Sequence, residues 1–250
     1  MKARLTVTDL TRMRGDRVCV GGCLDDGTCV RPVFASDGLR EDWLYARGQV
    51  VIQPFAVVEF DFHEKVPRPP HTEDRKIDRI YRVRRVMLNP NERRALLLRI
   101  LDHSVDTIFG TKIHREPGWY VQAGEGDRSL GTVQPRAIHA LDIKCRTWSR
   151  FDYHVSFTDQ CGEDYHLKVT DLAFQYFLHD LLSVQHLSPE EVAAQIVDAW
   201  SKRDTFFRIG LARGWEKYPD RCYLQLTGIY TFPDYLDGRC FADFTPAIPS

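Results

Sequence analysis

The chain has 250 residues and a formal net charge of −1, and this length suits one large or two small domains. Hydrophobic residues make up 43% of it and aromatic residues 12%, which excludes an intrinsically disordered protein. No apolar run approaches the ~20 residues of a membrane helix, and the N-terminus lacks the apolar segment of a secretory signal. We therefore expect a cytoplasmic protein with no membrane partner.

The seven cysteines are an odd number in a chain without a signal peptide, and we expect them to be reduced thiols. Three of them, Cys19, Cys23 and Cys29, lie close together in the sequence. Their spacing contains no CxxC pair and matches no common zinc pattern. The sequence therefore predicts no metal site, and nothing in it indicates a cofactor.

Residues 14–33 predict a β-hairpin with two strand-like runs around an Asp-Gly turn. The pair Gly21 and Gly22 interrupts the first run, which indicates a bulge or a close approach to the backbone. Three arginines lie near this hairpin, namely Arg14, Arg17 and Arg31. Their guanidinium groups suit phosphates and base edges, although a solvated hairpin would also carry them.

Residues 39–46 predict a short helix that contains Trp43, whose ring belongs to the core or to a stacking surface. A long β-like run over 50–62 follows, and a proline-rich passage ends it. His71, Glu73 and Asp74 come directly after the prolines. Such a group suits metal binding or acid–base work, or it caps the next element.

Residues 78–88 alternate as a strand that carries Tyr81, Arg82, Arg84 and Arg85. Between residues 65 and 99 there are eleven Lys or Arg against four Asp or Glu, a local excess of +7. A segregated basic segment in a nearly neutral chain indicates a polyanionic partner, unless it is simply a solvated face. A helix capped by Asn91 then closes the first domain.

The second half begins with the aromatic pair Trp119 and Tyr120 and a glycine-rich loop over 124–131 that contains Arg128. The loop matches neither a P-loop nor a dinucleotide motif, and it suits a phosphate, a carbonyl group or an ordinary hairpin. Strand-like runs follow over 137–148, 151–158 and 164–169, then a helical pair within about 171–202, then closing strands over 206–212 and 222–229.

This inventory predicts a mainly β fold with helices, of the α+β class. We expect two small OB-like β-barrels with capping and inserted helices. The first domain would span residues 1–103 and end with its closing helix. The second would span 104–250 and contain the helical pair.

Four passages resemble the dual OB-containing domain family of bacterial proteins. They are residues 15–22 leading into 29–33, residues 69–77, residues 128–131, and residues 165–171 before a helix. The sequence departs from the family pattern in having Val20-Gly21-Gly22 in place of Ala-Gly, and Cys29 in place of an aromatic residue.

The resemblance implies two OB barrels that bind nucleic acid or nucleotide through basic grooves and aromatic platforms. The leading hypothesis is a non-enzymatic protein that binds single-stranded DNA or RNA. Its candidate phosphate-binding residues are Arg14, Arg17, Arg31, Arg82, Arg84, Arg85 and Arg128. Its candidate stacking residues are Trp43, Tyr81, Trp119 and Tyr120.

Two alternatives remain open at this point. One is a metal-dependent enzyme acting on nucleic acid or nucleotide, with His71, Glu73 and Asp74 as its acid–base or metal-binding group. The other is a protein-interaction module of a bacterial multi-component system, whose barrels bind a protein partner. The sequence leaves open the strand type, the sequence specificity and the oligomeric state.

Overall fold

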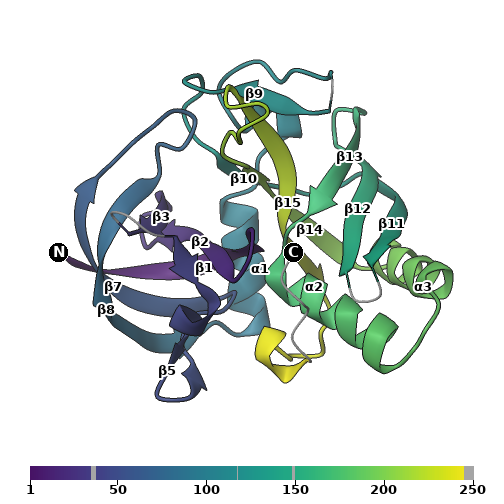
Figure 1. Ribbon diagram of the computed structural model, residues 1–250, viewed down its shortest axis with the longest axis horizontal. Helices are drawn as coiled ribbons and strands as arrows, with labels where there is room; N and C mark the ends of the chain where they lie inside the picture. Colours follow the sequence, from purple (N-terminus) through teal and green to yellow (C-terminus); the bar gives the residue numbers. More distant parts are fainter. Residues whose placement is uncertain (35–37, 117, 148–149, 245–250) are drawn as a thin grey trace.

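The computed structural model describes residues 1–34, 38–116, 118–147 and 150–244, and it places a closed β-barrel beside a second β-sheet (Figure 1). The strands of the N-terminal half are β1 (Lys2–Arg12), β2 (Arg17–Leu24), β3 (Cys29–Val33), β4 (Leu39–Arg40), β5 (Tyr45–Ala46), β6 (Gln49–Val50), β7 (Ala56–Lys65) and β8 (Asp74–Met87). The strands of the C-terminal half are β9 (Tyr120–Gln122), β10 (Leu130–Val133), β11 (Ala137–Thr147), β12 (Arg150–Thr158), β13 (Asp164–Val169), β14 (Asp204–Leu211) and β15 (Arg221–Phe232). The helices are α1 (Pro90–Arg99), α2 (Leu172–His179) and α3 (Pro189–Ser201).

The first barrel is closed by five strands in the order β1–β7–β8–β3–β2, because β2 pairs back onto β1. The first strand thus pairs with the second and the fourth, and the third strand runs parallel to the fifth. This arrangement is that of an OB-fold. Its interior is filled by alternate side chains of the strands, such as Leu5, Val58 and Phe60.

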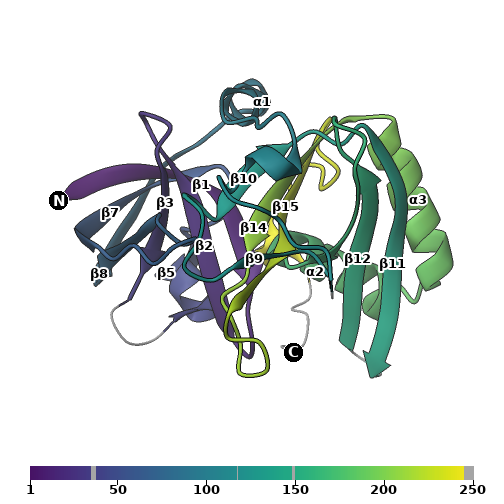
Figure 2. The same cartoon turned by 90° about the horizontal axis from the view of Figure 1, so that it is seen from above.

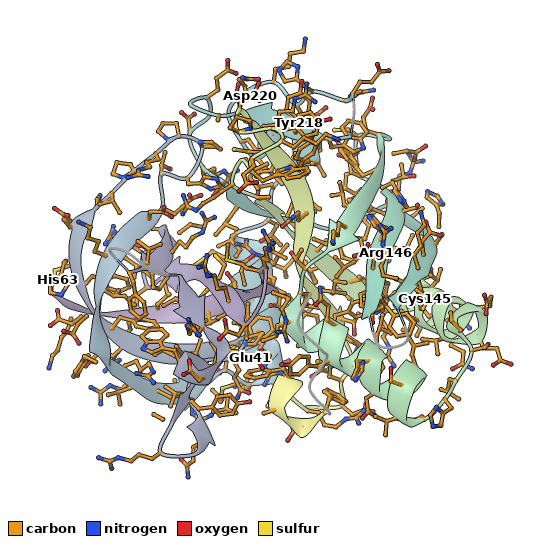
Figure 3. The ribbon with its side chains drawn as sticks, in the orientation of Figure 1. Glu41, His63, Cys145, Arg146, Tyr218 and Asp220 are labelled. Atoms are coloured by element: carbon orange, nitrogen blue, oxygen red, sulfur yellow. The ribbon has the colours of Figure 1, made fainter. Side chains whose placement is uncertain are left out.

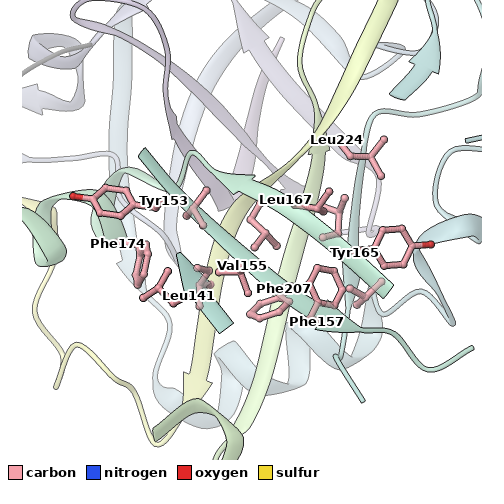
Figure 4. Packing of buried hydrophobic residues seen from close by; sticks show 14 of the residues in the cluster. Leu141, Tyr153, Val155, Phe157, Tyr165, Leu167, Phe174, Phe207 and Leu224 are labelled. Carbon is pink, nitrogen blue, oxygen red and sulfur yellow. The ribbon is translucent and has the colours of Figure 1, made fainter. Parts of the chain in front are cut away.

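The second sheet, which we call the second barrel, repeats this order with an interrupted first strand. Its sheet runs β10–β14–β15–β13–β12–β11, and β13 is parallel to β15. Residues 134–136 join β10 directly to β11, so the two strands act as halves of one first strand. Figure 4 shows the core of this barrel, where Val155 and Phe157 of β12 meet Leu167 of β13 and Phe207 of β14. The predicted mainly β fold with two OB-like barrels is confirmed.

The helices cap and connect the barrels as predicted, with two local corrections. Helix α1 begins at Pro90 and not after Asn91, because the Asn89 side chain accepts from the Glu92 backbone in a reciprocal capping box. The helix expected over 39–46 is wrong, since the structure has only a four-residue 3₁₀ turn, Glu41–Leu44. Burial of the Trp43 and Leu44 side chains and pairing of the next two short strands override helix propensity there.

Helix α2 and the C-terminal segment connect the two cores. Leu172, Ala173 and Tyr176 of α2 pack in the core of the first barrel, whereas Phe174 and Leu178 pack in the second. Leu236, Phe241 and Phe244, which follow the last strand, also join the first core. Figure 2 shows α1 above the junction of the barrels and α3 on the far flank beside β11. The division into domains at residue 103 stays a prediction.

The glycine pair of β2 marks both a bulge and a close approach. The pairing of β1 with β2 shifts between Val7 and Asp9, which face Gly22 and Gly21. A Cβ atom on Gly22 would lie 2.2 Å from the carbonyl oxygen of Thr6. Because that neighbour is backbone, it cannot move aside as a flexible side chain would.

Replacing Gly22 with alanine should therefore lower the free energy of unfolding by about 3 kcal/mol, as for overpacking against backbone. The Gly27→Ala variant is the control, since Gly27 has φ +86 but no neighbour within 4 Å of an added Cβ. It should cost only about 1 kcal/mol of backbone strain. Urea unfolding of the three proteins measures both values, and equal costs would contradict the close approach.

Candidate functional site

The outer face of β1, β2 and β3 in the first barrel packs against the second barrel. A Cβ atom on Gly21 would lie 2.9 Å from Leu130 of β10, which shows how closely the strands approach. Tyr230 of β15 donates a hydrogen bond to the backbone oxygen of Thr8 at 2.8 Å. The junction is therefore built from strands of both barrels.

A buried ion pair lies in this junction. Arg208 of β14 donates from Nη2 to Oδ2 of Asp9 in β1 at 2.8 Å, and both side chains are at most 3% exposed. Arg208 also donates to Thr132 at 2.6 Å, and Thr227 donates to Asp9 at 2.6 Å. Burial alone would raise the pKa of Asp9, but the charge and hydrogen bonds of Arg208 outweigh it and lower the pKa.

A second buried network contains four of the sequence-predicted residues, namely Arg31, His71, Glu73 and Asp74. Arg31 Nη1 lies 2.9 Å from His71 Nδ1 and 3.4 Å from Asp74 Oδ1. Arg31 Nη2 donates to Ser129 of the second barrel at 2.5 Å. Arg213, which follows β14, donates to the other oxygen of Asp74. These contacts again tie the first barrel to the second.

The glycine-rich loop, residues 124–131, binds the carboxylate of Glu73. The backbone N–H and the hydroxyl of Ser129 both donate to the carboxylate of Glu73. The neighbouring Arg128 pairs with Asp102 and donates to the backbone oxygen of Ile108. The loop thus binds an acidic side chain of the first barrel, where the sequence left open a phosphate, a carbonyl group or an ordinary hairpin loop.

His71 is held neutral in this network. Burial, and then the charges of Arg31 and Arg213, lower the pKa of His71 to about 2, against a weak opposing effect of the Ala212 backbone. Since Arg31 is a donor, the neutral imidazole accepts at Nδ1 and carries its proton on Nε2. His71, Glu73 and Asp74 are each at most 6% exposed, and all three side chains make hydrogen bonds within the junction.

The three arginines of the predicted hairpin separate in the structure. Arg31 is buried in the junction, whereas Arg14 and Arg17 are exposed. Arg14 lies at the cavity described below, together with Arg31. Arg17 lies opposite Arg40 in the short pairing of β2 with β4. The structure therefore brings Arg14 and Arg31, but not Arg17, to one site.

The three arginines of β8 that the sequence singled out, Arg82, Arg84 and Arg85, have different surroundings. The Arg82 guanidinium lies 4.6 Å from the ring centre of Trp43. Arg85 donates to Glu59 at 2.6 Å on the neighbouring strand, and Arg84 is exposed. The strand is thus not lined by three equivalent cations.

The four predicted stacking residues are buried or half-buried. Trp43 is 9% exposed and its ring stacks on Phe60 with 6.0 Å between ring centres. Tyr120 is also 9% exposed, and Trp119 is half-buried. Tyr81 is half-buried, and its hydroxyl donates to Glu59. Of these, Tyr120 belongs to an aromatic cluster that the sequence did not reveal.

That cluster lies at the hairpin between β14 and β15, and we call it the hairpin surface. It is a row of five rings with consecutive ring centres 4.9–6.3 Å apart, flanked by two cations. The rings and then the cations are Trp215, Tyr218, Tyr223, Tyr120 and His114, with Lys217 and Arg221. Figure 3 labels Tyr218 and Asp220 at this end of the molecule. The signal in the sequence is the run 213–223, in which basic and aromatic residues alternate across a turn.

A cavity of about 300 Å³ lies beside the hairpin surface, in the junction of the barrels. It is lined by the end of β1, by β2 and β3, and by residues 210–214 of the second barrel. Its arginines are Arg12, Arg14, Arg31 and Arg213, and its one carboxylate is Asp9, which Arg208 neutralises. The geometry therefore offers a positively charged hollow next to an aromatic row.

Comparison with known proteins fits this architecture. The profile of the family described as the dual OB-containing domain matches residues 6–229, a span of 224 of the 250 residues. The chain belongs to the dual OB-containing domain family. No curated protein and no solved structure matches it.

A larger cavity of about 500 Å³ in this dual OB protein is a weaker candidate site. It is lined by Phe55, α1, the end of β15 and the segment after it. Two of its arginines are already paired, Arg93 with Asp234 and Arg94 with Asp204. Within the described residues, no three His, Cys, Asp or Glu side chains come together to hold a metal ion. None of the helices that the structure describes has the length and apolar character to cross a membrane.

The Arg208→Met variant tests the buried ion pair. It leaves the Asp9 carboxylate buried without its cation, and the free energy of unfolding should fall by about 3–5 kcal/mol. The control is Arg94→Met, because Arg94 pairs with Asp204 at the surface and is 48% exposed. That variant should cost less than about 1 kcal/mol. Similar costs in urea unfolding would mean that the buried pair is no stronger than a surface pair.

The His71→Asn variant tests the neutral imidazole. The unfolded chain protonates His71 near pH 6.5, whereas the folded protein does so only near pH 2. Between these values the unfolded state binds more protons, so stability rises with pH up to about 6.5 and is flat above.

From about pH 7.5 to about pH 5.5, the wild type should therefore lose about 1.4 kcal/mol more stability than the variant. Asparagine can still accept from Arg31 but does not titrate. Denaturant unfolding at the two pH values measures the stability loss of each protein. The other titrating groups are the same in both proteins, so their effects cancel in the difference between the two losses. Equal pH dependence would show that His71 has the same pKa in the folded protein as in the unfolded chain, which would contradict the neutral imidazole.

Proposed function

We propose that the protein binds single-stranded nucleic acid, DNA or RNA, without catalysing a reaction on it, and that the hairpin surface is where the bases stack. The observation that carries the proposal is the exposed indole of Trp215, which is 54% exposed at the end of the aromatic row. An exposed tryptophan followed by further rings and cations is the pattern of a base-stacking platform.

The position of this surface in the fold supports the proposal. OB-folds bind oligonucleotides with the face of their second and third strands and with two loops, one of which joins the fourth and fifth strands. In the second barrel that loop is the β14–β15 hairpin, which carries Trp215 and Tyr218. In the first barrel the matching loop, residues 66–73, contributes His71 and Glu73 to the buried junction. The second barrel therefore has the accessible binding elements.

The charges around the hairpin surface suit a phosphate backbone. Arg221 lies 4.6 Å from the ring centre of Tyr218 and 4.8 Å from that of Tyr120. Lys217 lies 5.3 Å from the ring centre of Tyr218. Arg14 and Arg213 are exposed at the adjoining cavity. Cations interleaved with rings can contact phosphates while the rings stack on bases.

The solvent-facing side of β12 and β13 in the second barrel carries further rings and a cation. His154 of β12 and His166 of β13 stack with ring centres 5.0 Å apart and planes at 6°. Lys168 lies on the same face and pairs with Asp152. This face corresponds to the second and third strands of an OB-fold, and imidazole rings also stack on unpaired bases.

The Trp215→Ala variant tests the stacking surface. Fluorescence anisotropy would use labelled single-stranded DNA, single-stranded RNA and a duplex of the same sequence, at low and near-physiological salt. Since one stacked base contributes about 1–3 kcal/mol, the dissociation constant for a single strand should rise about tenfold in the variant. Trp215→Phe should keep most of the affinity, and the wild type should bind more weakly as salt rises.

The matched control is Val86→Ala, which trims another exposed hydrophobic side chain, 52% exposed on β8, far from the hairpin in the sequence. It should leave the dissociation constant unchanged. Failure of the well-folded wild type to bind any of the three nucleic acids would refute the proposed function. Equal binding by Trp215→Ala and the wild type would move the site away from the hairpin surface.

A further inference from the structure

The cavity in the junction has an excess of positive charge. Arg12 pairs with Glu41 at 3.1 Å. Arg31 and Arg213 both pair with the carboxylate of Asp74, and the Glu73 carboxylate also stabilises the charge of Arg31. Arg14 has no ion-pair partner among the residues that the structure describes. The guanidinium groups at the cavity therefore outnumber the carboxylates that face them.

Two of these arginines are deeply buried with incomplete hydrogen bonding. Arg12 is 7% exposed, and its Nη2 donates to the Tyr176 hydroxyl at 2.7 Å. Arg31 is 4% exposed, and both of its Nη atoms have partners in the second network. Arg12 Nη1 and Arg31 Nε are buried, yet neither has a hydrogen-bond partner in the described part of the chain.

An unpaired N–H of a buried guanidinium is costly, and native proteins rarely leave two of them beside one hollow without a ligand. The group that would satisfy them must be an acceptor, because arginine only donates. It must also be anionic, because the surrounding charge is positive. The cavity volume of about 300 Å³ is at the lower end of the range for small-molecule sites.

We propose that this cavity binds a phosphate monoester, either the terminal phosphate of a nucleic-acid strand or the phosphate of a free mononucleotide. A monoester dianion has three oxygens free to accept from several guanidinium groups at once, which an internal phosphodiester lacks. Arg12 and Arg31 would bind it from the interior, and Arg14 and Arg213 from the rim. The strand form of this ligand rests on the proposed function, whereas the mononucleotide form does not.

The adjoining hairpin surface gives the strand form its geometry. Arg213 and Gly214 line the cavity and directly precede Trp215 in the chain. A strand with its terminal phosphate in the cavity would therefore place its first bases beside the exposed indole. The cavity would bind the terminal phosphate of the strand, and the aromatic row would bind the bases that follow it.

The test compares ligands that differ only in a phosphate. A single-stranded 12-mer would carry a 5′-phosphate, a 3′-phosphate or hydroxyl groups at both ends, and binding would be followed by fluorescence anisotropy. Thymidine monophosphate and thymidine would be compared by isothermal titration calorimetry. One phosphorylated ligand should bind about tenfold more tightly than its unphosphorylated counterpart, as for one or two charge-assisted hydrogen bonds.

The variant is Arg14→Glu, which puts a negative charge at the rim and changes an exposed side chain, so the fold should be kept. The control is Arg47→Glu, the same charge reversal in the exposed turn between β5 and β6, outside the cavity. The preference for phosphate should disappear in Arg14→Glu and persist in Arg47→Glu.

The outcomes separate the two proposals. A phosphate preference among the 12-mers assigns the cavity to strand ends. Preference for the monophosphate over thymidine, with 12-mers that bind equally or not at all, assigns it to free nucleotides. Binding of all 12-mers alike, with no binding of the monophosphate, would overturn the phosphate site while leaving the proposed function intact. A preference that survives in Arg14→Glu would also overturn it.

Discussion

Arg208 is a fully buried arginine between two barrels, and its charge is balanced there by Asp9 of the other barrel. Taking a guanidinium out of water without a partner costs several kcal/mol, so the pair strongly restricts how the barrels can be arranged. The Arg31 network adds a second polar contact between the barrels, because Arg31 reaches Ser129 and Asp74 reaches Arg213. Two such contacts leave little freedom to rotate one barrel against the other.

This fixed arrangement gives the two similar barrels different accessible surfaces. The face of β1–β3 that would be open in an isolated OB-fold is used for packing, and residues 66–73 supply side chains to the junction. The second barrel keeps its corresponding loop in solvent, with Trp215 exposed at 54%. The first barrel then contributes mainly the arginines that line the cavity. Fold repetition in this chain therefore does not mean repetition of the proposed binding surface.

The sequence predicted most of the fold because its signals are local. Alternating runs indicated the strands, and the helical pair expected within about 171–202 is present as α2 and α3, which Asp171 and Ser188 cap. The site was harder to predict because its contacts join residues that are far apart in the sequence. Asp9 and Arg208 are 199 residues apart, and Arg31 and Ser129 are 98 apart. Nothing in a local pattern distinguishes Arg31, which is buried, from Arg14 and Arg17, which are exposed. The sequence also does not show which tryptophan side chains are exposed. In the structure Trp43 is buried, whereas Trp215 is exposed.

The packing of the C-terminal segment has a consequence for how the protein is made. Leu236, Phe241 and Phe244 belong to the core of the barrel whose strands begin at Lys2. Leu172 and Tyr176 of α2 complete the same core. During synthesis the first barrel therefore cannot bury its whole core when its own strands have left the ribosome. It stays incomplete until the segment after β15 emerges, so part of its apolar surface must be protected from aggregation for nearly the entire time of translation.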